Sequence, residues 1–311
     1  MKNEEQDNPQ ETEQVSRRSF IEKGALGLGA IALAAGGASQ IIGQTKNPIE
    51  PKPDRVNPNG RFTSKVVLIT GATSGIGEGT AYAFAREGAR VFFCGRRENL
   101  GKQVEAKIRS FGGEATYMRA DVRREDDVKN FVDTVVKKYG RLDIAFNNAG
   151  IESPRAVPIA EQTLSDWQNV ITTNATGVFL SMKYELPYLL KNNGGAIINN
   201  GSVSGHVGWA TISPYSASKH AILSLTKVAA LEYADKNIRV NSISPGAVDT
   251  PMLRRAMQSF NLTEQQIAEP YPIKRLATTE EMARAVMFLA SEEASVITGM
   301  DMDVTGGYLT K

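Results

Sequence analysis

The sequence predicts a doubly wound α/β fold in a single domain, because short apolar runs alternate with helical segments over residues 65–311. Seven runs are expected to be strands: residues 65–70, 90–94, 114–119, 142–147, 195–199, 239–243 and 300–304. Helical patterns include residues 98–111, 124–139, 165–191, 214–234 and 279–291. The runs are nearly continuously apolar, which is typical of parallel strands that are covered on both faces. Alternation of this kind favours a parallel sheet between two helical layers, with the ligand site at the carboxyl edge.

The composition excludes several classes of function. The chain has 311 residues, of which 41% are hydrophobic and 23% charged, as is usual for a globular domain. A net charge of +2 gives no reason to expect nucleic acid as a partner. The single cysteine, Cys94, rules out an internal disulfide, and we expect it to be buried in a strand. With only His206 and His220 in addition, we expect no metal site.

Residues 1–42 are predicted to be an export signal. A twin-arginine pattern occupies Ser16, Arg17, Arg18, Phe20 and Lys23, and a short apolar run rich in Ala, Gly and Leu follows to about residue 38. The segment resembles a Tat signal, which implies export of the folded protein to the periplasm by the Tat machinery. A disordered tail with a chance arginine pair, on a cytoplasmic protein, is the alternative, and an uncleaved signal would instead anchor the protein to the membrane. Residues 43–64 are proline-rich and are interpreted as an extended linker.

The turn after the first predicted strand has the composition of a dinucleotide-binding loop. Gly71, Gly75 and Gly77 follow that strand directly, and a helix is expected to begin near Gly75. Glycines permit a sharp turn, close approach of the backbone to phosphates and tight packing of the helix on the strand. The free N–H groups and positive end of that helix would then face a pyrophosphate. This context predicts a Rossmann-type domain.

The spacing Gly-x3-Gly-x-Gly resembles that of the short-chain dehydrogenase/reductase family, and the resemblance covers residues 65–311. Further family motifs follow in order: Asp121-Val122, Asn147-Asn148-Ala149-Gly150, and Pro245-Gly246 with Val248 and Thr250. The resemblance implies that a nicotinamide dinucleotide is held by Gly71, Thr73, Ser74, Gly75, Ile76, Gly77, Asp121, Val122, Asn148, Ala149, Gly150, Tyr215, Lys219, Pro245, Gly246, Val248 and Thr250.

NADP is favoured over NAD as the cofactor. An acidic residue after the second strand usually binds the ribose 2′-hydroxyl of NAD, but Gly95 stands there, followed by Arg96 and Arg97. Arg96 could pair with a 2′-phosphate. Against this, Ser74 stands where many NADP-dependent relatives carry a basic residue. The alternative for Arg96 and Arg97 is a solvated pair without a role.

Tyr215 and Lys219 are the candidate catalytic pair, because a spacing of four places both on one face of a helix. Hydride transfer to a carbonyl develops an alkoxide that needs a proton, and we expect Lys219 and a bound nicotinamide cation to lower the pKa of the phenol. Ser202 would hold the substrate oxygen. The family resemblance adds Asn174, which would hold a proton-relaying water with Lys219, and places Lys219 against the nicotinamide ribose.

Three further regions lie near these residues in the sequence. The sequence has Asn200 two residues before Ser202, where the family more often has an apolar residue, so Asn200 is expected to need a polar partner. His206 is expected to be an ordinary loop residue or a substrate contact, and Trp209 is the better candidate for an apolar pocket. Residues 249–275 are predicted to be a lid, whose Met252, Leu253, Met257 and Phe260 line a pocket or form the lid's own core.

The sequence therefore predicts an NAD(P)-dependent oxidoreductase acting on a secondary alcohol or ketone. A nucleotide-binding sensor without catalysis is the alternative, and an epimerase or dehydratase of the longer sister family would need a different glycine spacing and a further domain. The helix over residues 215–234 is apolar on most of its surface, so one face could cover a second subunit or a neighbouring helix. By resemblance we expect a homodimer or homotetramer.

Overall fold

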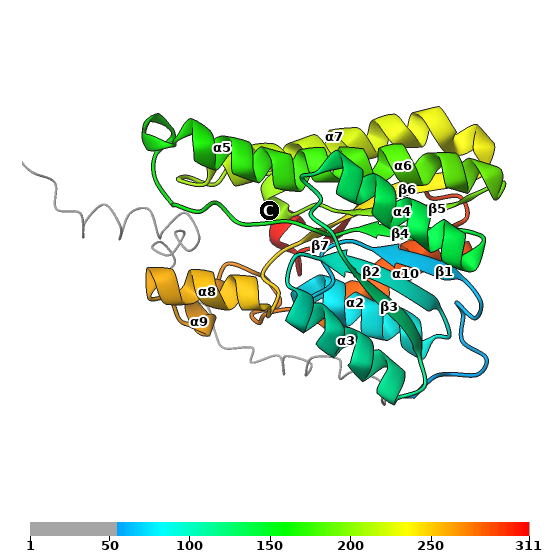
Figure 1. Ribbon diagram of the computed structural model, residues 1–311. Coiled ribbons are helices and arrows are strands. Elements are labelled where there is room, and N and C mark those ends of the chain that lie inside the picture. The colour runs from blue at the N-terminus through cyan, green and yellow to red at the C-terminus, as the bar shows by residue number, and fades with distance from the viewer. Residues whose placement is uncertain (1–54, 311) are drawn as a thin grey trace, which may run out of the picture.

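A seven-stranded sheet runs through the computed structural model of the protein, which describes residues 55–310 (Figure 1). The strands lie in the order β3-β2-β1-β4-β5-β6-β7, and every neighbouring pair is parallel. Their bounds are β1 Val66–Ile69, β2 Arg90–Gly95, β3 Glu114–Arg119, β4 Ile144–Asn147, β5 Gly195–Asn200, β6 Ile238–Pro245 and β7 Asp301–Val304. The predicted doubly wound fold is confirmed.

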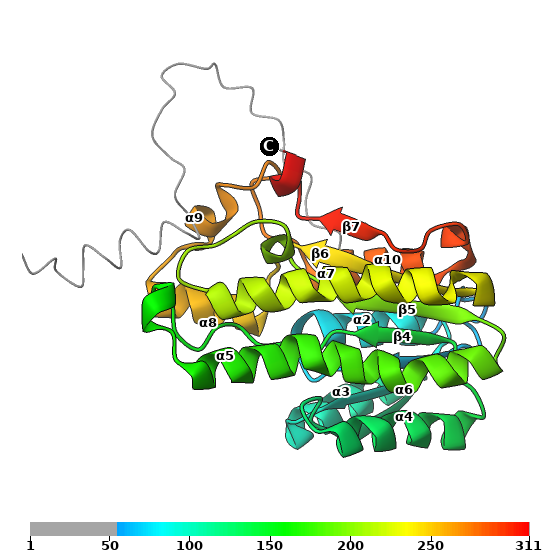
Figure 2. The same ribbon diagram turned by 90° about the horizontal axis from the view of Figure 1, so that it is seen from above.

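Two layers of helices cover the sheet, since successive residues of each inner strand face opposite sides. In β1, Val67 and Ile69 face the layer of α2 and α3, whereas Val66 and Leu68 face the layer of α4 and α6. The helices are α2 Gly75–Arg86, α3 Glu98–Ser110, α4 Glu125–Tyr139, α5 Leu164–Ile171, α6 Gly177–Lys191, α7 Ser213–Tyr233, α8 Pro251–Phe260, α9 Glu264–Ala268 and α10 Thr279–Ala290. Figures 1 and 2 show α2, α3 and α10 on one face and α4, α5, α6 and α7 on the other.

The carboxyl ends of the strands meet at one edge, and α8 and α9 lie at that end of the molecule (Figure 2). β1 lies between β2 and β4, so the chain leaves β1 toward one side of the sheet and later returns on the other. A crevice at such a switch point is where open α/β sheets bind their ligands. The turns after β1, β4, β5 and β6 therefore border the crevice in which a ligand site is expected.

The helix predicted over residues 165–191 is not continuous. α5 ends at Ile171, a π-helical turn spans Thr172–Thr176, and α6 begins at Gly177. A π turn holds one residue more than an α turn and is frequent at functional sites. A single widened turn inside a long helical segment has no local sequence signature, so this turn, which contains Asn174, was not predicted.

Several segments bear on the predicted domain boundaries. Phe62, in the segment interpreted as a linker, is buried and packs edge-on against Phe84 of α2 at 4.8 Å between ring centroids.

The predicted Tat signal lies outside the described residues. Within residues 55–310, no helix is long and apolar enough to cross a membrane, and no cluster of three His, Cys, Asp or Glu side chains is placed to hold a metal ion. Cys94 is buried in β2, as predicted.

A carboxyl group is buried between the sheet and α6. Glu185 is fully buried, and its Oε2 accepts a hydrogen bond of 3.1 Å from Nδ2 of Asn147 in β4. The same Asn147 Nδ2 donates to Oδ1 of Asn199, whose amide in turn donates to Thr226. Burial raises the pKa of Glu185 from its ordinary value of 4.5 to about 8, so this carboxyl group is mostly protonated at pH 7.

We expect Glu185→Gln to remove a pH dependence of folding stability. The folded protein keeps a proton on Glu185 up to about pH 8, whereas the unfolded chain loses it near its ordinary pKa of 4.5. The wild type should therefore lose free energy of unfolding as the pH rises from about 4.5 to 8, and the neutral glutamine should not. Urea unfolding of both proteins at several pH values measures the difference, which should grow by a few kcal/mol, order of magnitude, across this window. Parallel pH profiles for the two proteins would contradict the assignment.

Candidate active site

The glycine turn after β1 has a backbone that only glycine fits. Gly71 and Gly75 have φ values of +69° and +64°, in the left-handed region. A Cβ atom on Gly71 would lie 2.6 Å from the Cα of Ala149, and one on Gly77 would lie 2.8 Å from the carbonyl oxygen of Gly71. The turn is therefore pressed against the segment after β4, and α2 against the turn.

The first turn of α2 is left open toward this edge. Ser74 is its N-cap residue but accepts no capping hydrogen bond through its side chain. Backbone N–H groups without an acceptor at the positive end of a helix suit an anionic group. The glycines and this helix end together fit the pyrophosphate of a dinucleotide. Thr73 is buried, and Ile76 packs inward against Val248 and Ala277.

Asn148 joins the glycine turn to the rest of the site. Its Nδ2 donates to the carbonyl oxygens of Thr70 and Gly71 at 3.0 and 3.1 Å, and its Oδ1 accepts from Nδ2 of Asn200 at 3.0 Å. The backbone N–H groups of Asn148 and Ala149 both donate to Oγ1 of Thr70. The predicted polar partner of Asn200 is thus Asn148. The hydrogen bond between their side-chain amides links β5, through Asn148, to the turn after β1.

Lys219 is bonded to the next residue in this chain of contacts. Its ammonium Nζ donates to the backbone carbonyl oxygen of Asn200 at 2.7 Å, and the side chain is 4% exposed. That is its one hydrogen bond to the described residues, so further N–H donors remain for a ligand. A buried cation with donors to spare fits the ribose hydroxyls of a nicotinamide nucleotide.

The structure brings Tyr215 and Ser202 to the same place. Lys219 Nζ lies 5.6 Å from the centre of the Tyr215 ring, and the Ser202 hydroxyl lies close enough to the Tyr215 hydroxyl to lower its pKa. Ser202 is buried at the end of β5, where its Oγ accepts from the N–H of Ser204 at 3.1 Å. The predicted Ser–Tyr–Lys group is therefore assembled, with the two hydroxyl oxygens adjacent.

Burial dominates the electrostatics of this group. It lowers the pKa of Lys219 to about 7, so the amine is only partly charged at neutral pH. Burial also raises the pKa of Tyr215, the hydrogen bond with Ser202 lowers it, and the charge of Glu152 raises it. Among the protein groups, burial of the phenol therefore has the largest effect on the pKa of Tyr215. The lowering expected from Lys219 together with a bound nicotinamide cation stays a prediction.

Asn174 is held rigidly in the π-helical turn. The side chain is fully buried, its Nδ2 donates to the carbonyl oxygen of Ile151 and to Oγ of Ser218 at 3.0 Å each, and its Oδ1 accepts from the N–H of Ile151 at 2.8 Å. It thereby ties the loop after β4 to the residue that precedes Lys219. Its predicted part in a proton relay stays a prediction.

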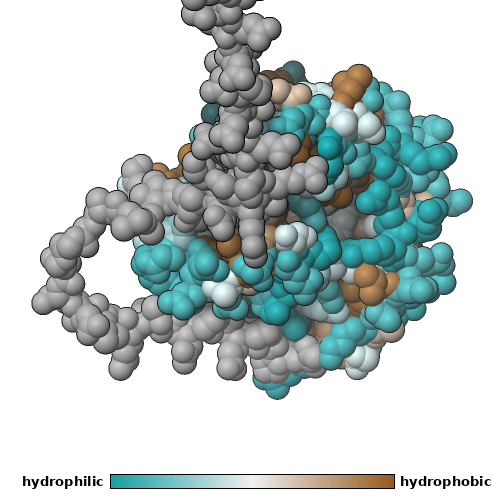
Figure 3. Space-filling view, turned by 90° about the vertical axis from the view of Figure 1, so that its left-hand side faces the viewer, coloured by the Kyte–Doolittle hydropathy of each residue, from teal (hydrophilic) through white to brown (hydrophobic). Residues whose placement is uncertain are grey.

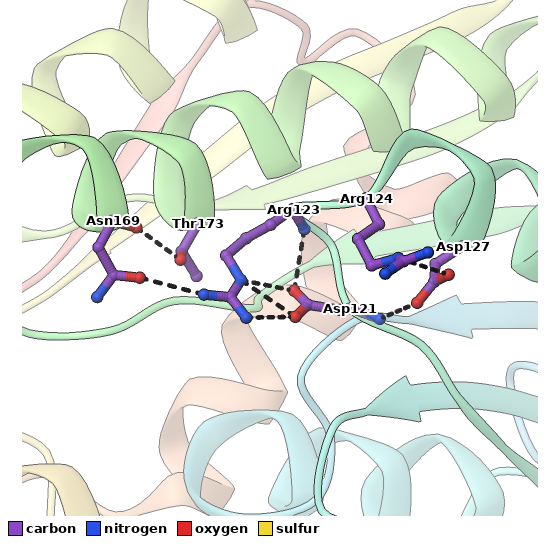
Figure 4. A network of polar contacts seen from close by, with 6 residues as sticks. All are labelled: Asp121, Arg123, Arg124, Asp127, Asn169 and Thr173. Atoms are coloured by element: carbon purple, nitrogen blue, oxygen red, sulfur yellow. Dashed lines mark hydrogen bonds and ion pairs between the residues drawn. The ribbon is translucent and has the colours of Figure 1, made fainter. Parts of the chain in front are cut away.

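Asp121 and Val122 lie beside this edge, after β3. Both carboxylate oxygens of Asp121 accept from the guanidinium of Arg123, which also reaches Asn169 of α5 (Figure 4). This pairing lowers the pKa of Asp121. Val122 is buried against Gly177, at the start of α6. The pair thus forms a fixed wall at the place where the resemblance puts the adenine.

Arg97, not Arg96, contacts the glycine turn. Its Nη2 donates to Oγ1 of Thr73 at 2.9 Å and to Oγ of Ser74 at 2.5 Å. A Cβ atom on Gly95 would lie 2.6 Å from the Thr73 side chain, so the position gives no room for the acid of NAD-binding sites. The binding of a 2′-phosphate by Arg96 stays a prediction, and the contact of Arg97 with the turn was not predicted because residue spacing does not reveal which of two adjacent arginines turns inward.

The segment after β6 closes the site from the other side. Gly246 is packed against Tyr271, and Val248 is buried and bridges to Ala277. Thr250 caps α8 by accepting from the N–H of Leu253. Leu253 and Met257 of α8 pack into a small core with Ile267 of α9, whereas Met252 and Phe260 are half-exposed and belong to no described core cluster. The lid residues thus divide between lid core and a free apolar face.

Three aromatic rings pack together at the carboxyl edge, where Tyr271 lies against Gly246 after β6, and we call Trp209, Tyr271 and Tyr308 the aromatic wall. Trp209 stacks on Tyr308 at 5.6 Å, and Tyr308 contacts Tyr271 at 5.1 Å. Tyr271 lies close enough to Tyr215 for the two hydroxyls to interact electrostatically.

His206, the other candidate on the loop after Ser202, pairs with Asp301 of β7 at 2.6 Å. Figure 3 faces this end of the molecule and shows hydrophobic residues in small patches among hydrophilic ones.

Comparison with known proteins identifies the relatives of this chain. Residues 71–309 match the family model described as enoyl-(acyl carrier protein) reductase. A cyclohexanol dehydrogenase of Acinetobacter sp. (strain SE19) is 40% identical over 81% of this chain and 98% of its own length. A 3beta-hydroxysteroid dehydrogenase of Mediterraneibacter gnavus is 38% identical over 81% and 97%. The solved structure of ElxO with NADP bound superposes with a TM-score of 0.75 at 36% identity, over 79% of this chain and 99% of that one.

Proposed function

We propose a specific function for this chain from one premise: it belongs to the short-chain dehydrogenase/reductase family and is an NAD(P)-dependent oxidoreductase acting on CH–OH groups. The proposal is that it interconverts a ring-borne secondary alcohol and its ketone with NADP as cofactor. The observation that carries it is the assembled group of Ser202, Tyr215 and Lys219 at the carboxyl edge, next to a turn that fits a dinucleotide.

A ring-shaped apolar substrate is supported by the walls of the site. The aromatic wall offers flat faces near Tyr215, and Met252 and Phe260 of the lid are half-exposed apolar side chains outside the lid's own core. The named relatives act, by their names, on cyclohexanol and on a hydroxysteroid, both of which are ring alcohols. A flat aliphatic ring would bury its faces against these side chains.

The roles of the side chains follow from their positions. A bound nicotinamide would supply or accept the hydride. Ser202 holds the substrate oxygen by a hydrogen bond, and Tyr215 donates a proton to that oxygen in reduction or takes one from it in oxidation. Lys219, with a pKa near 7, exchanges protons readily at neutral pH and keeps the phenol and the ribose in place. Asn174 fixes the loop after β4 that borders the reacting atoms.

NADP is supported as the preferred cofactor by Arg97 and by the shape of Gly95. The guanidinium already lies over Thr73 and Ser74, and Arg96 adds a second positive charge nearby. A side chain at residue 95 would displace Thr73, so no carboxylate from this position faces the 2′-phosphate.

Export by the Tat route is proposed from the sequence alone. The twin-arginine pattern at Arg17 and Arg18 and the apolar run after it support it. The Tat route carries folded proteins, so a dinucleotide bound before export could travel with the protein to the periplasm. Once there, alternating oxidation and reduction of two substrates would recycle the bound cofactor.

A homodimer or homotetramer is proposed from the outer faces of α6 and α7. Phe179 on α6 is 49% exposed, and Val228 and Leu231 on α7 are 48% and 85% exposed. Large apolar side chains that reach solvent on two neighbouring helices favour a contact with a second copy.

Replacing Tyr215 by phenylalanine should abolish proton transfer while leaving the dinucleotide bound. We expect kcat for oxidation of cyclohexanol or reduction of cyclohexanone to fall by about 10²- to 10⁴-fold, because one general acid–base group is lost. Steady-state absorbance at the NADPH band measures this, with NADPH binding by fluorescence as the control. Unchanged turnover in the variant would overturn the mechanism, and binding without turnover in the wild type would favour a nucleotide sensor.

Arg97→Gln should reduce the preference for NADP over NAD by about tenfold, since one charge-assisted contact to a phosphate is lost. The measurement is the ratio of kcat/KM for the two cofactors. Arg96→Gln is the matched neighbour and should have the smaller effect, because only Arg97 contacts Thr73 and Ser74. A larger effect at Arg96, or no effect at either position, would contradict the assignment.

Changing Arg17 and Arg18 together to lysine should block export. Fusion of residues 1–54 to a reporter that is active only after Tat export gives the readout, with the unaltered segment as control. Export that persists in the lysine pair, or that is absent with the natural pair, would remove the Tat assignment.

Leu231→Lys should weaken the subunit contact, because a buried ammonium in an apolar interface is strongly unfavourable. Light scattering after size exclusion should then show a smaller particle than the wild type. Ile159→Lys, at a position 77% exposed but outside α6 and α7, serves as the control and should leave the mass unchanged. A wild type that is already monomeric would refute the proposed assembly.

A further inference from the structure

An ion pair crosses from the lid to the loop after β4. Nη2 of Arg255, in α8, lies 3.2 Å from Oε1 of Glu152, 103 residues earlier in the chain. Glu152 follows Ile151, whose backbone N–H and C=O are both bonded to Asn174, so the carboxylate is presented from a fixed segment. The side chains of Arg255 and Glu152 are 54% and 39% exposed, and a pair this exposed is held weakly.

The face of α8 that carries Arg255 begins over the glycine turn. A Cβ atom on Gly75 would lie 3.4 Å from the methyl group of Thr250 and 4.0 Å from Cδ of Pro251. Arg255 is four residues after Pro251, so the two share one side of the helix, one turn apart. Arg255 therefore stands above the place where the turn and the start of α2 fit a pyrophosphate.

A second arginine faces Arg255 across this space. Arg97 lies against Thr73 and Ser74. Burial lowers the pKa of Arg97 most, the positive charges of Arg255 and Arg96 lower it further, and Glu78 acts in the opposite direction. Arg255 and Arg97 thus come from opposite sides of the crevice and repel each other. An anion of high charge between them would attract both guanidinium groups and offset their mutual repulsion.

We propose that Arg255 is a phosphate-binding residue of the lid. When a dinucleotide binds, Arg255 exchanges its ion pair with Glu152 for a phosphate group of that dinucleotide. The inference rests on the proposed function, because it requires that a dinucleotide binds at this edge. The phosphate is either the pyrophosphate over Gly75 or the 2′-phosphate near Arg97. Guanidinium binds both in bidentate fashion, and either exceeds a single carboxylate in charge. Glu152 is the competitor that holds Arg255 until the phosphate takes its place.

Equilibrium binding tests the proposal without turnover. The dissociation constant of NADPH is measured by fluorescence for the wild type, Arg255→Gln, Glu152→Gln and Arg254→Gln. We expect Arg255→Gln to weaken binding roughly three- to tenfold and Glu152→Gln to strengthen it slightly, because the competing carboxylate is gone. Arg254 is the matched control, since it is the adjacent arginine of α8 and pairs with Asp249 at 2.7 Å instead. Its change should leave the constant unaltered.

Two fragments separate the sources of the phosphate. Adenosine 2′,5′-bisphosphate carries the 2′-phosphate without a pyrophosphate, and ADP carries a pyrophosphate without a 2′-phosphate. Weaker binding of either fragment to Arg255→Gln supports the proposal and identifies the phosphate. Equal affinities of wild type and Arg255→Gln for NADPH and both fragments would overturn it, as would Glu152→Gln weakening binding as much as Arg255→Gln. A wild type that binds NADPH would leave the proposed function standing in that case, whereas one that binds no nucleotide would refute both.

Discussion

The side-chain amide of Asn148 is the contact on which the geometry of the site depends. It donates to two carbonyl groups of the turn after β1 and accepts from Asn200, whose own carbonyl oxygen accepts from Lys219. A continuous series of hydrogen bonds thus runs from the cradle that fits a dinucleotide to the residues that fit proton transfer. Hydride and proton must reach adjacent atoms of one substrate, so these two halves have to be held in fixed register. The strand ladders and the backbone bonds to Thr70 also join these segments, and the Asn148 side chain adds the direct link between the glycine turn and Asn200.

Burial gives this arrangement both its stiffness and its chemistry. Asn174, Ser202 and Lys219 are nearly inaccessible to water, and hydrogen bonds hold each of them in place. The same burial brings the pKa of Lys219 to about 7 and raises that of Tyr215. Glu185 sits deeper in the same layer and is kept neutral for the same reason. The site is therefore poised to move protons near neutrality, and a bound cation would act on Tyr215 with little screening.

Much of the fold and of the central group could be predicted from the sequence, because both depend on local patterns. Seven apolar runs correspond to the seven strands, and the spacing of Tyr215 and Lys219 on one helix turn already places them together. Features that depend on tertiary contacts could not be predicted. The π turn contains Asn174, whose partners Ile151 and Ser218 lie 23 and 44 residues away in the sequence. The inward turn of Arg97 rather than Arg96 depends on Thr73 and Ser74. The partner of Arg255 lies 103 residues away, beyond any local spacing rule.

The most direct test of the account is to identify the nucleotide that the protein carries. The protein would be isolated gently from its own cell compartment, denatured, and the released nucleotide identified and quantified by mass spectrometry. The account predicts NADP or NADPH in an amount close to that of the chain, in agreement with Arg97 over the glycine turn and with the proposed export of the protein with its cofactor bound. Recovery of NAD would contradict the cofactor assignment, and a protein that carries no nucleotide and binds none when NADPH is added would contradict the central claim.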